Sequence, residues 1–283
     1  VRRPSSRNRS PYVADVLVGG REAICHVPGL DLGGKCIPGA RLLVRPMRDK
    51  KGVLVGANTM GKFGTPKCEF VVQLVWCEEP EHGRRNQEGT WVGAHPRIGE
   101  LSARAILEGG HALGELSELR SEVRNVCGAD MRSDFVATCK ATGRRTVVEV
   151  KTVVDSDYDP AVVRDQGTEK QRHAMFFGPA GGAEYSRAGI FPYGGGNQRG
   201  PDGEKVVSAR AIKHVDELAR VARGELTEEG GEELAAAVLF VVARGDCDAF
   251  RPNHDACPSF SRHLQDGELP VRWPEQEEEE EEK

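Results

Sequence analysis

A Glu-x-Lys pair inside a run of apolar residues is the feature of this sequence most able to do chemistry. Glu149 and Lys151 lie in the β-branched run at 146–154. Side chains of a strand alternate between its two faces, and both charges therefore project from the same face. Asp134 precedes them in a second strand-like run and completes the pattern Asp-x14-Glu-x-Lys. These residue types are the ones that a metal-dependent phosphodiesterase needs, and they indicate a protein that cuts or grips nucleic acid.

The three side chains suit a magnesium-dependent hydrolase. Hydrolysis of a phosphodiester needs a divalent cation that activates water and neutralises charge on the phosphoryl oxygens. Mg²⁺, or Mn²⁺ in its place, is commonly held by one or two carboxylates, and we expect Asp134 and Glu149 to bind it. Lys151 is expected to orient the attacking water or to stabilise the charged transition state. The alternative is an ordinary salt bridge on an exposed sheet face. The apolar surroundings favour a site, because unpaired charge is costly there.

Basic residues flank the strands that carry this triplet. A basic rim is what a cleft for a polyanion needs, and binding to it is sensitive to salt. We predict that this rim contacts nucleic acid. Its members are Arg120, Arg124, Arg132, Arg144 and Arg145.

A second charged group lies on a predicted helix at about 206–223. Arg210, Lys213, His214 and Glu217 are spaced i, i+3, i+4 and i+7, and we expect them to share one face that is distinct from the apolar stripe. Arg210 and Lys213 are predicted to contact phosphates, and His214 is predicted to contact nucleic acid or to carry a proton. The alternative is the solvated charged face of any surface helix.

The order of apolar patterns predicts two folded regions. Four or five short strands with Gly and Pro between them, over residues 12–76, indicate a small β-barrel. A helix near 98–107, strands near 119–126, 132–138 and 145–154, the helix at 206–223 and a fully buried strand at 235–242 describe an α/β domain with a mixed sheet. Residues 155–205 are rich in glycine and are predicted to form a long flexible insertion.

Composition sets further expectations. The formal net charge is −5, but the Glu-rich tail and the Arg-rich first ten residues carry much of the charge, and the body is nearly neutral. Charge alone thus leaves a polyanionic partner open. No apolar run approaches the length of a membrane span, which predicts a soluble protein without a membrane partner, cytoplasmic or organellar. The Arg/Ser-rich start resembles the remnant of a transit peptide, and a flexible basic arm or a truncated sequence has the same composition. Reduced thiols are expected for the eight cysteines.

Short motifs across about residues 12–273 resemble, in the correct order, those of the sugar fermentation stimulation protein (SfsA) family. Arg132-Ser133-Asp134-Phe135 is similar to the family's Arg-Ile-Asp-Phe, and Val148-Glu149-Val150-Lys151 to its Val-Glu-Val-Lys. The segment 207–214 resembles its Val-Thr-x-Arg-Gly-x-Lys-His. Further similar segments occur at 12–16, 26–28, 38–41, 91–93, 122–124 and 250–253.

This resemblance implies an α+β fold of two domains, with an N-terminal OB-like β-barrel and a C-terminal α/β domain of the PD-(D/E)xK restriction-endonuclease type. It implies DNA binding, and it implies Asp134, Glu149 and Lys151 as the active-site residues. The predicted division is a flexible basic arm at 1–11, the barrel at 12–78, a linker at 79–96, the nuclease-like domain at 97–274 with its insertion at 155–205, and an acidic disordered tail at 275–283.

The leading functional prediction is a DNA-binding protein with a nuclease site that depends on Mg²⁺ or Mn²⁺. A non-catalytic DNA-binding regulatory protein that retains the nuclease scaffold is the alternative, and it predicts a mobility shift without cleavage. A metabolic enzyme for a phosphorylated small molecule also stays open, and a pocket too narrow for a duplex would favour it.

Overall fold

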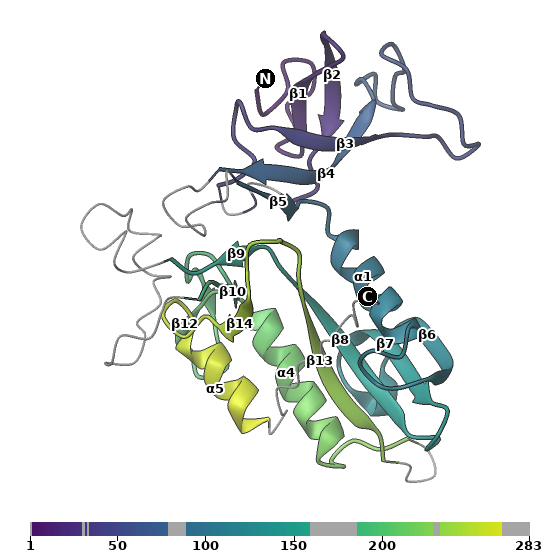
Figure 1. The fold of residues 1–283 in the computed structure, drawn as a ribbon, viewed down its shortest axis with the longest axis vertical. Coiled ribbons are helices and arrows are strands. Elements are labelled where there is room, and N and C mark those ends of the chain that lie inside the picture. Colours follow the sequence, from purple (N-terminus) through teal and green to yellow (C-terminus); the bar gives the residue numbers. More distant parts are fainter. Residues whose placement is uncertain are drawn as a thin grey trace, which may run out of the picture. The chain divides into compact units, whose positions relative to one another are not determined.

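The chain is described by a computed structural model that covers residues 2–29, 32, 34–78, 89–158, 186–228 and 233–267. It has a mixed α+β fold with two compact units (Figure 1). Each unit gathers three stretches of sequence. Unit 1 contains Val1–Gly99, Thr152–Gly196 and Val241–Cys257, and unit 2 contains Glu100–Lys151, Asn197–Phe240 and Pro258–Lys283. The domain boundaries drawn from the sequence stay a prediction.

Unit 1 contains a five-stranded sheet. β1 and β2 form a hairpin whose turn is Gly19-Gly20, and both glycines have a positive φ that other residues adopt with difficulty. β4 pairs in parallel with β2 and antiparallel with β3 and β5. Among the described residues this pairing does not close into a barrel. The strands are β1 (Val13–Val18), β2 (Arg21–His26), β3 (Leu42–Pro46), β4 (Phe70–Cys77) and β5 (Thr90–Gly93).

The segment before β1 is anchored to the sheet, where the sequence predicted a flexible arm. The carboxylate of Asp15 is buried and accepts hydrogen bonds from the Ser5 hydroxyl at 2.5 Å and the Ser6 amide at 2.8 Å. Burial acts to raise the pKa of Asp15, but these hydrogen bonds and the charge of Arg7 outweigh it and lower the pKa. A buried carboxylate needs such partners, and they hold this segment in place.

Part of the predicted linker is also sheet. β5 pairs with β4, and the Gly93 amide donates to the Ala243 carbonyl at 2.7 Å. A Cβ on Gly93 would lie 2.8 Å from the Cβ of Ala243, so glycine is required here by close approach. Residues 79–88 of the predicted linker lie outside the described residues, as does the acidic tail.

The predicted insertion at 155–205 contains strands, which corrects the expectation of a flexible segment for its described residues. β10 (Ala188–Phe191) pairs in parallel with β14 (Ala249–Pro252) and antiparallel with β9 (Asp155–Ser156). Pairing between residues so far apart in the sequence leaves no local pattern. Residues 159–185 lie outside the described residues.

Unit 2 is built on a four-stranded sheet with the order β13-β8-β7-β6 (Figure 1). Helix α4 covers one face of this sheet. Phe135 projects from the opposite face, and the guanidinium carbon of Arg104, on helix α1, lies 5.2 Å from the centroid of its ring. The remaining elements are a short β-hairpin and helix α5. The bounds are α1 (Arg97–Glu108), β6 (Leu116–Arg124), β7 (Arg132–Cys139), β8 (Arg145–Val153), β11 (Gln198–Arg199), β12 (Lys205–Val206), α4 (Ala209–Ala222), β13 (Ala235–Val242) and α5 (Pro258–Asp266), with a 3-10 turn at Val126–Gly128.

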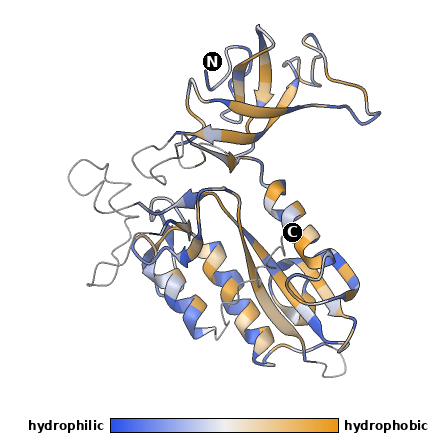
Figure 2. Cartoon of the chain, viewed as in Figure 1, coloured by the Kyte–Doolittle hydropathy of each residue, from blue (hydrophilic) through white to orange (hydrophobic). Residues whose placement is uncertain are grey.

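Helix α4 begins where its capping residue stands. The Ser208 hydroxyl accepts a hydrogen bond from the Ala211 amide at 3.2 Å, which satisfies one of the unpaired donors of the first turn. One face of the helix is apolar (Figure 2), and Leu218 and Val221 pack with Val136 and Val147 of the sheet. This packing fixes the rotation of α4, and with it the residues that reach the sheet.

Strand β13 is only partly buried, although its apolar run predicted a fully buried strand. All of its residues except Val241 retain some exposure. β13 is the edge strand of the sheet, and an edge position leaves solvent on one side.

No helix within the described part of the chain is long and apolar enough to cross a membrane. The eight cysteines are free thiols.

We expect these thiols to differ in reactivity. Burial raises the pKa of Cys25 to about 12, and that of Cys247 to about 12, whereas hydrogen bonds from Thr142 lower the pKa of Cys139. Because the thiolate is the nucleophile, iodoacetamide at pH 8 should modify Cys139 first and reach Cys25 and Cys247 only after unfolding. Peptide mass spectrometry over time measures this order. Equal rates at Cys25 and Cys139 in the native protein would contradict it.

Candidate functional site

The three residues of the Asp-x14-Glu-x-Lys pattern meet on one face of the unit 2 sheet. Asp134 lies on β7, and Glu149 and Lys151 lie on β8. The register that pairs Phe135 with Val148 brings Asp134 and Glu149 to the next position along the two strands. The Val150 amide donates to Asp134 Oδ2 at 2.7 Å, which holds the carboxylate against β8.

Glu149 is the centre of this group. Its side chain is buried, and its Oε1 accepts from Lys151 Nζ at 2.5 Å and lies 2.6 Å from His214 Nδ1. Its second oxygen, Oε2, is buried and has no hydrogen-bond partner among the described residues. A buried carboxylate oxygen is costly unless a donor or a cation contacts it, and the oxygen is therefore a candidate ligand for a cation.

The two carboxylates have pKa values shifted in opposite directions. Burial, together with the negative charge of Glu149, raises the pKa of Asp134. Burial also acts on Glu149, but the hydrogen bond from His214 and the charge of Lys151 outweigh it and lower the pKa of Glu149. The surroundings therefore favour the charged form of Glu149 and disfavour the charged form of Asp134.

These observations test whether a divalent cation fits. No cluster of three or more His, Cys, Asp or Glu side chains that could hold a metal occurs among the residues described. Mg²⁺ does not require one, since it is commonly bound through one or two carboxylates and keeps several waters. Asp134 and the unpartnered Oε2 of Glu149 offer such a pair of hard oxygen ligands, and the residues present fit the ion.

His214 lies beside Glu149, and not on the solvated helix face that was the alternative to a functional role. Its side chain is buried, and it faces Glu149 from α4. Arg210 Nε donates to His214 Nε2 at 3.4 Å, and since a guanidinium has only donors, Nε2 accepts and Nδ1 carries the proton toward Glu149. The i, i+4 spacing of Arg210 and His214 was visible in the sequence. The inward rotation of His214 was not, because it depends on the packing of α4.

Comparisons with known proteins agree on one family. A family model described as "Sugar fermentation stimulation protein RE domain" matches residues 201–268. A protein of Maricaulis maris, described as a sugar fermentation stimulation protein homolog, is 30% identical over 182 residues, which are 63% of this chain and 56% of that protein. A structure titled as Pyrococcus furiosus SfsA in complex with Ca²⁺ has a TM-score of 0.55 and 16% identity, and covers 94% of this chain and 84% of that chain. The chain is similar to proteins of the SfsA family.

The family match and the polar triplet come from different parts of the chain. The matched residues 201–268 include α4 with Arg210, Lys213 and His214, whereas Asp134, Glu149 and Lys151 lie before them. The ring of His214 joins the two parts through Glu149. The chain spans little more than half of the length of the curated SfsA relative, and the likeness to the solved SfsA structure concerns the fold alone.

Most of the basic residues predicted to contact nucleic acid are exposed, and several are paired with acids. Arg145 and His214 are the exceptions: Arg145 is partly buried and lies 3.1 Å from the carboxylate of Glu228, and His214 is buried. Arg120 and Arg132 lie 3.8 Å and 2.7 Å from the carboxylates of Glu118 and Glu122, and Lys213 lies 2.5 Å from that of Asp130. Arg124 is exposed on edge strand β6, opposite Arg132. The pairs of Arg120, Arg132 and Lys213 are solvent-exposed and therefore weak, so a phosphate can compete for the cations.

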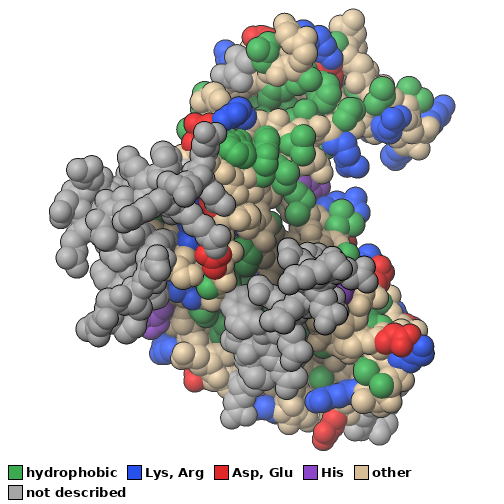
Figure 3. Space-filling model, in the orientation of Figure 1, with side chains coloured by type: hydrophobic (Ala, Val, Ile, Leu, Met, Phe, Trp, Pro, Cys, Tyr) green, Lys and Arg blue, Asp and Glu red, His purple; other side chains and the backbone are tan. Residues whose placement is uncertain are grey.

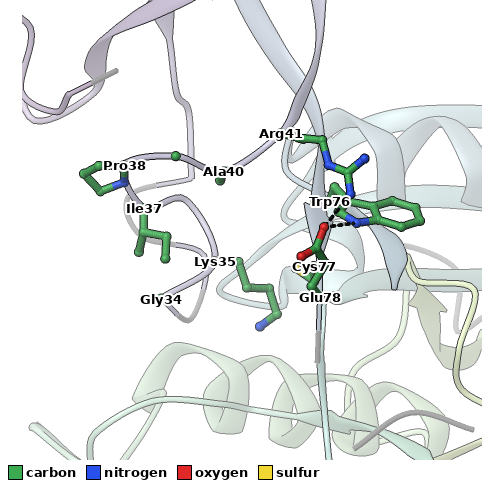
Figure 4. A pocket seen from close by; sticks show the side chains of 10 residues that line it. Gly34, Lys35, Ile37, Pro38, Ala40, Arg41, Trp76, Cys77 and Glu78 are labelled. Atoms are coloured by element: carbon green, nitrogen blue, oxygen red, sulfur yellow. Dashed lines mark hydrogen bonds and ion pairs between the residues drawn. The ribbon is translucent and has the colours of Figure 1, made fainter. Parts of the chain in front are cut away.

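A pocket of about 300 Å³ lies in unit 1 and contains none of the predicted site residues (Figure 4). The guanidinium of Arg41 lies 5.2 Å from the ring centroid of Trp76 and pairs with Glu78, to which Trp76 also donates a hydrogen bond at 3.0 Å. The cation and the ring therefore already have partners within the chain. The pocket is lined by Gly34, Lys35, Ile37, Pro38, Gly39, Ala40, Arg41, Trp76, Cys77 and Glu78.

Proposed function

We propose that this chain is a DNA-binding protein with a magnesium-dependent phosphodiesterase site at Asp134, Glu149 and Lys151. In this proposal unit 2 is a nuclease domain of the PD-(D/E)xK type, and the first sheet of unit 1 is of the OB-like type, a five-stranded barrel that is partly open. The observation that carries the proposal is the buried, unpartnered Oε2 of Glu149, on a carboxylate beside Lys151 and close to Asp134.

The residues of the site have separate roles in this mechanism. Asp134 and Glu149 would hold Mg²⁺, which supplies activation of water and neutralisation of the phosphoryl oxygens when it is bound. Lys151 presents its ammonium group to the attacking water or to the charge that develops on the phosphate. His214 fixes the rotamer of Glu149 through Nδ1–H, and Arg210 fixes the tautomer of His214. The buried strands around Glu149 exclude water and strengthen each of these interactions.

Two further observations support the proposal. The SfsA of Pyrococcus furiosus was solved in complex with Ca²⁺, which is consistent with a divalent cation as a ligand of this chain. Exposed basic residues accompany the triplet on β6, β7 and α4, where they can contact phosphates of a bound strand; they are Arg120, Arg124, Arg132, Arg210 and Lys213.

The direct test is cleavage of plasmid and single-stranded DNA by the purified chain with Mg²⁺ or Mn²⁺ and with EDTA. We expect cleavage only with the metal. Absence of cleavage with either ion, by a protein that still binds DNA, would overturn the catalytic proposal.

That outcome would favour a second function, a non-catalytic DNA-binding protein that retains the scaffold. The observation in its favour is that Oε1 of Glu149 is already shared by Lys151 and His214, as in a buried structural ion pair. It predicts slower migration of DNA on a native gel, unchanged in Glu149→Gln.

His214 provides a test of the positioning role. We expect His214→Ala to raise the Mg²⁺ concentration for half-maximal cleavage by about 10- to 100-fold, because partners of metal-binding groups typically contribute that much. His214→Asn should restore much of the affinity, since its amide N–H can take the place of Nδ1–H. A titration of activity against Mg²⁺ measures both. Loss of activity in both variants with an unchanged Mg²⁺ midpoint would instead indicate a purely structural role.

A further inference from the structure

A pair of small hairpins projects between β3 and β4 of unit 1 (Figure 1). We call residues 47–68 the twin hairpin. The first hairpin is closed by the Val55 amide, which donates to the Met47 carbonyl at 2.9 Å, and the second by the Lys67 amide, which donates to the Thr59 carbonyl at 2.9 Å. Isolated bridges pair Arg48 with Leu54 and Met60 with Pro66. The backbone of both hairpins is therefore held by hydrogen bonds within the chain.

The twin hairpin concentrates positive charge in a chain whose net charge is −5. Its basic residues are Arg48, Lys50, Lys51, Lys62 and Lys67, and all five are exposed. The one acidic residue of the twin hairpin is Asp49. Its carboxylate accepts hydrogen bonds from the Lys51 and Val53 amides at 2.8 Å and 2.9 Å and so stabilises the turn. Among the described residues, none of the four lysines has an ion-pair partner. Lysine and arginine side chains are seen on the projecting lobe in Figure 3.

The same surface exposes large apolar side chains. Phe63 at the tip of the second hairpin is 86% exposed, and Val53, Leu54 and Met60 are each more than half exposed. The ammonium group of Lys62 lies 5.9 Å from the centroid of the Phe63 ring. Several large apolar side chains exposed among basic ones are typical of a surface that binds a partner.

We propose that the twin hairpin binds single-stranded DNA, with Phe63 stacking on a base and Lys50, Lys51, Lys62 and Lys67 contacting phosphates. This inference rests on the proposed function for the choice of DNA as the polyanion. A nucleotide carries a phosphate beside a flat base, and the neighbouring Lys62 and Phe63 present the matching pair of groups. An anionic membrane surface also attracts lysines, but it has no flat partner for the ring, and that difference makes the two occupants separable.

Fluorescence anisotropy of a labelled oligodeoxythymidylate, in EDTA so that no cleavage occurs, tests the proposal on the full chain. We expect Phe63→Ala to weaken binding by about tenfold, the range for loss of one stacked base. Phe63→Trp should bind as well as the native protein, and Phe63→Leu should bind as weakly as Phe63→Ala. Replacing the four lysines by alanine should lower the slope of log affinity against log salt by roughly 0.7 per lysine.

Lys140→Ala, which removes an exposed lysine next to β7, is the matched control and should leave binding unchanged. Hydrolysis of bis(p-nitrophenyl) phosphate with Mn²⁺ separates this inference from the proposed function, because so small a substrate does not need the twin hairpin. Absent hydrolysis with Phe63-dependent binding would remove the catalytic proposal and leave this one standing. DNA binding that is unchanged in all hairpin variants would overturn the proposal for the twin hairpin. Affinity of Phe63→Leu for phosphatidylserine vesicles equal to that of the native protein, with no effect of any variant on DNA binding, would also overturn it.

Discussion

Replacing Lys151 by alanine is expected to lower the rate of Mg²⁺-dependent DNA cleavage by about 10²- to 10³-fold. The ammonium group of Lys151 is held against Glu149 on the same face of β8, in a half-buried position where a charge is poorly screened. Removing one preorganised group of this kind from a site typically has an effect of that size. Asp134→Asn should reduce cleavage at least as much, because the amide keeps the shape of the side chain and loses the charge that a cation needs.

Supercoiled plasmid DNA and initial rates at saturating Mg²⁺ measure this effect, with Lys140→Ala as a control for loss of a positive charge. Lys140 is exposed and pairs with Glu115 at 2.5 Å, and its removal should leave the rate within about twofold. Circular dichroism establishes that each variant is folded. Equal cleavage by native protein, Lys151→Ala and Asp134→Asn would remove these residues from any catalytic role.

The second large effect concerns stability. Asp246→Ala is expected to reduce the free energy of unfolding by about 3–5 kcal/mol, as for the removal of one partner from a buried ion pair. Asp246 lies between two buried guanidinium groups: Arg187 Nη1 is 2.7 Å from its Oδ2, and Arg244 Nε is 2.6 Å from its Oδ1. The side chains of all three residues are at most 5% exposed. Without the carboxylate, two positive charges would remain buried close together.

Urea unfolding followed by tryptophan fluorescence measures this change, and Trp76 and Trp91 of unit 1 contribute to the signal. Glu22→Ala, at an exposed position on β2, is the control and should shift stability by no more than about 0.5 kcal/mol. A shift for Asp246→Ala as small as that of the control would show that the guanidinium groups find other partners.

The same carboxylate contributes a dependence on pH. Burial acts to raise the pKa of Asp246, but the hydrogen bond and charge of Arg244 and the charge of Arg187 outweigh it, and the folded-state pKa lies below the usual value of 3.8. The stabilisation is therefore fully present above that value and is lost as the pH falls through the lower folded-state pKa.

The sequence by itself determined much of the secondary structure and the chemical core of the site. Alternation along 146–154 predicted that Glu149 and Lys151 share a face, and the structure places them together. The helices at 97–108 and 209–222 and the strands at 13–18, 70–77 and 235–242 also follow their apolar patterns closely. These features depend on residues that are near one another in the chain, because the spacing of apolar and polar side chains decides which face of a helix or strand is buried.

Only the tertiary structure decided which distant groups meet. His214 contacts Glu149 across 65 positions of sequence, and Arg187 contacts Asp246 across 59. The rotation of α4 follows from its packing against Val136 and Val147, and β10 exists as a strand because β14 lies beside it. No local pattern in the long loop between β3 and β4 indicated whether Phe63 is buried. The tertiary structure shows that its side chain is exposed. A local pattern does not predict such contacts between distant residues, because they form only when the whole chain packs.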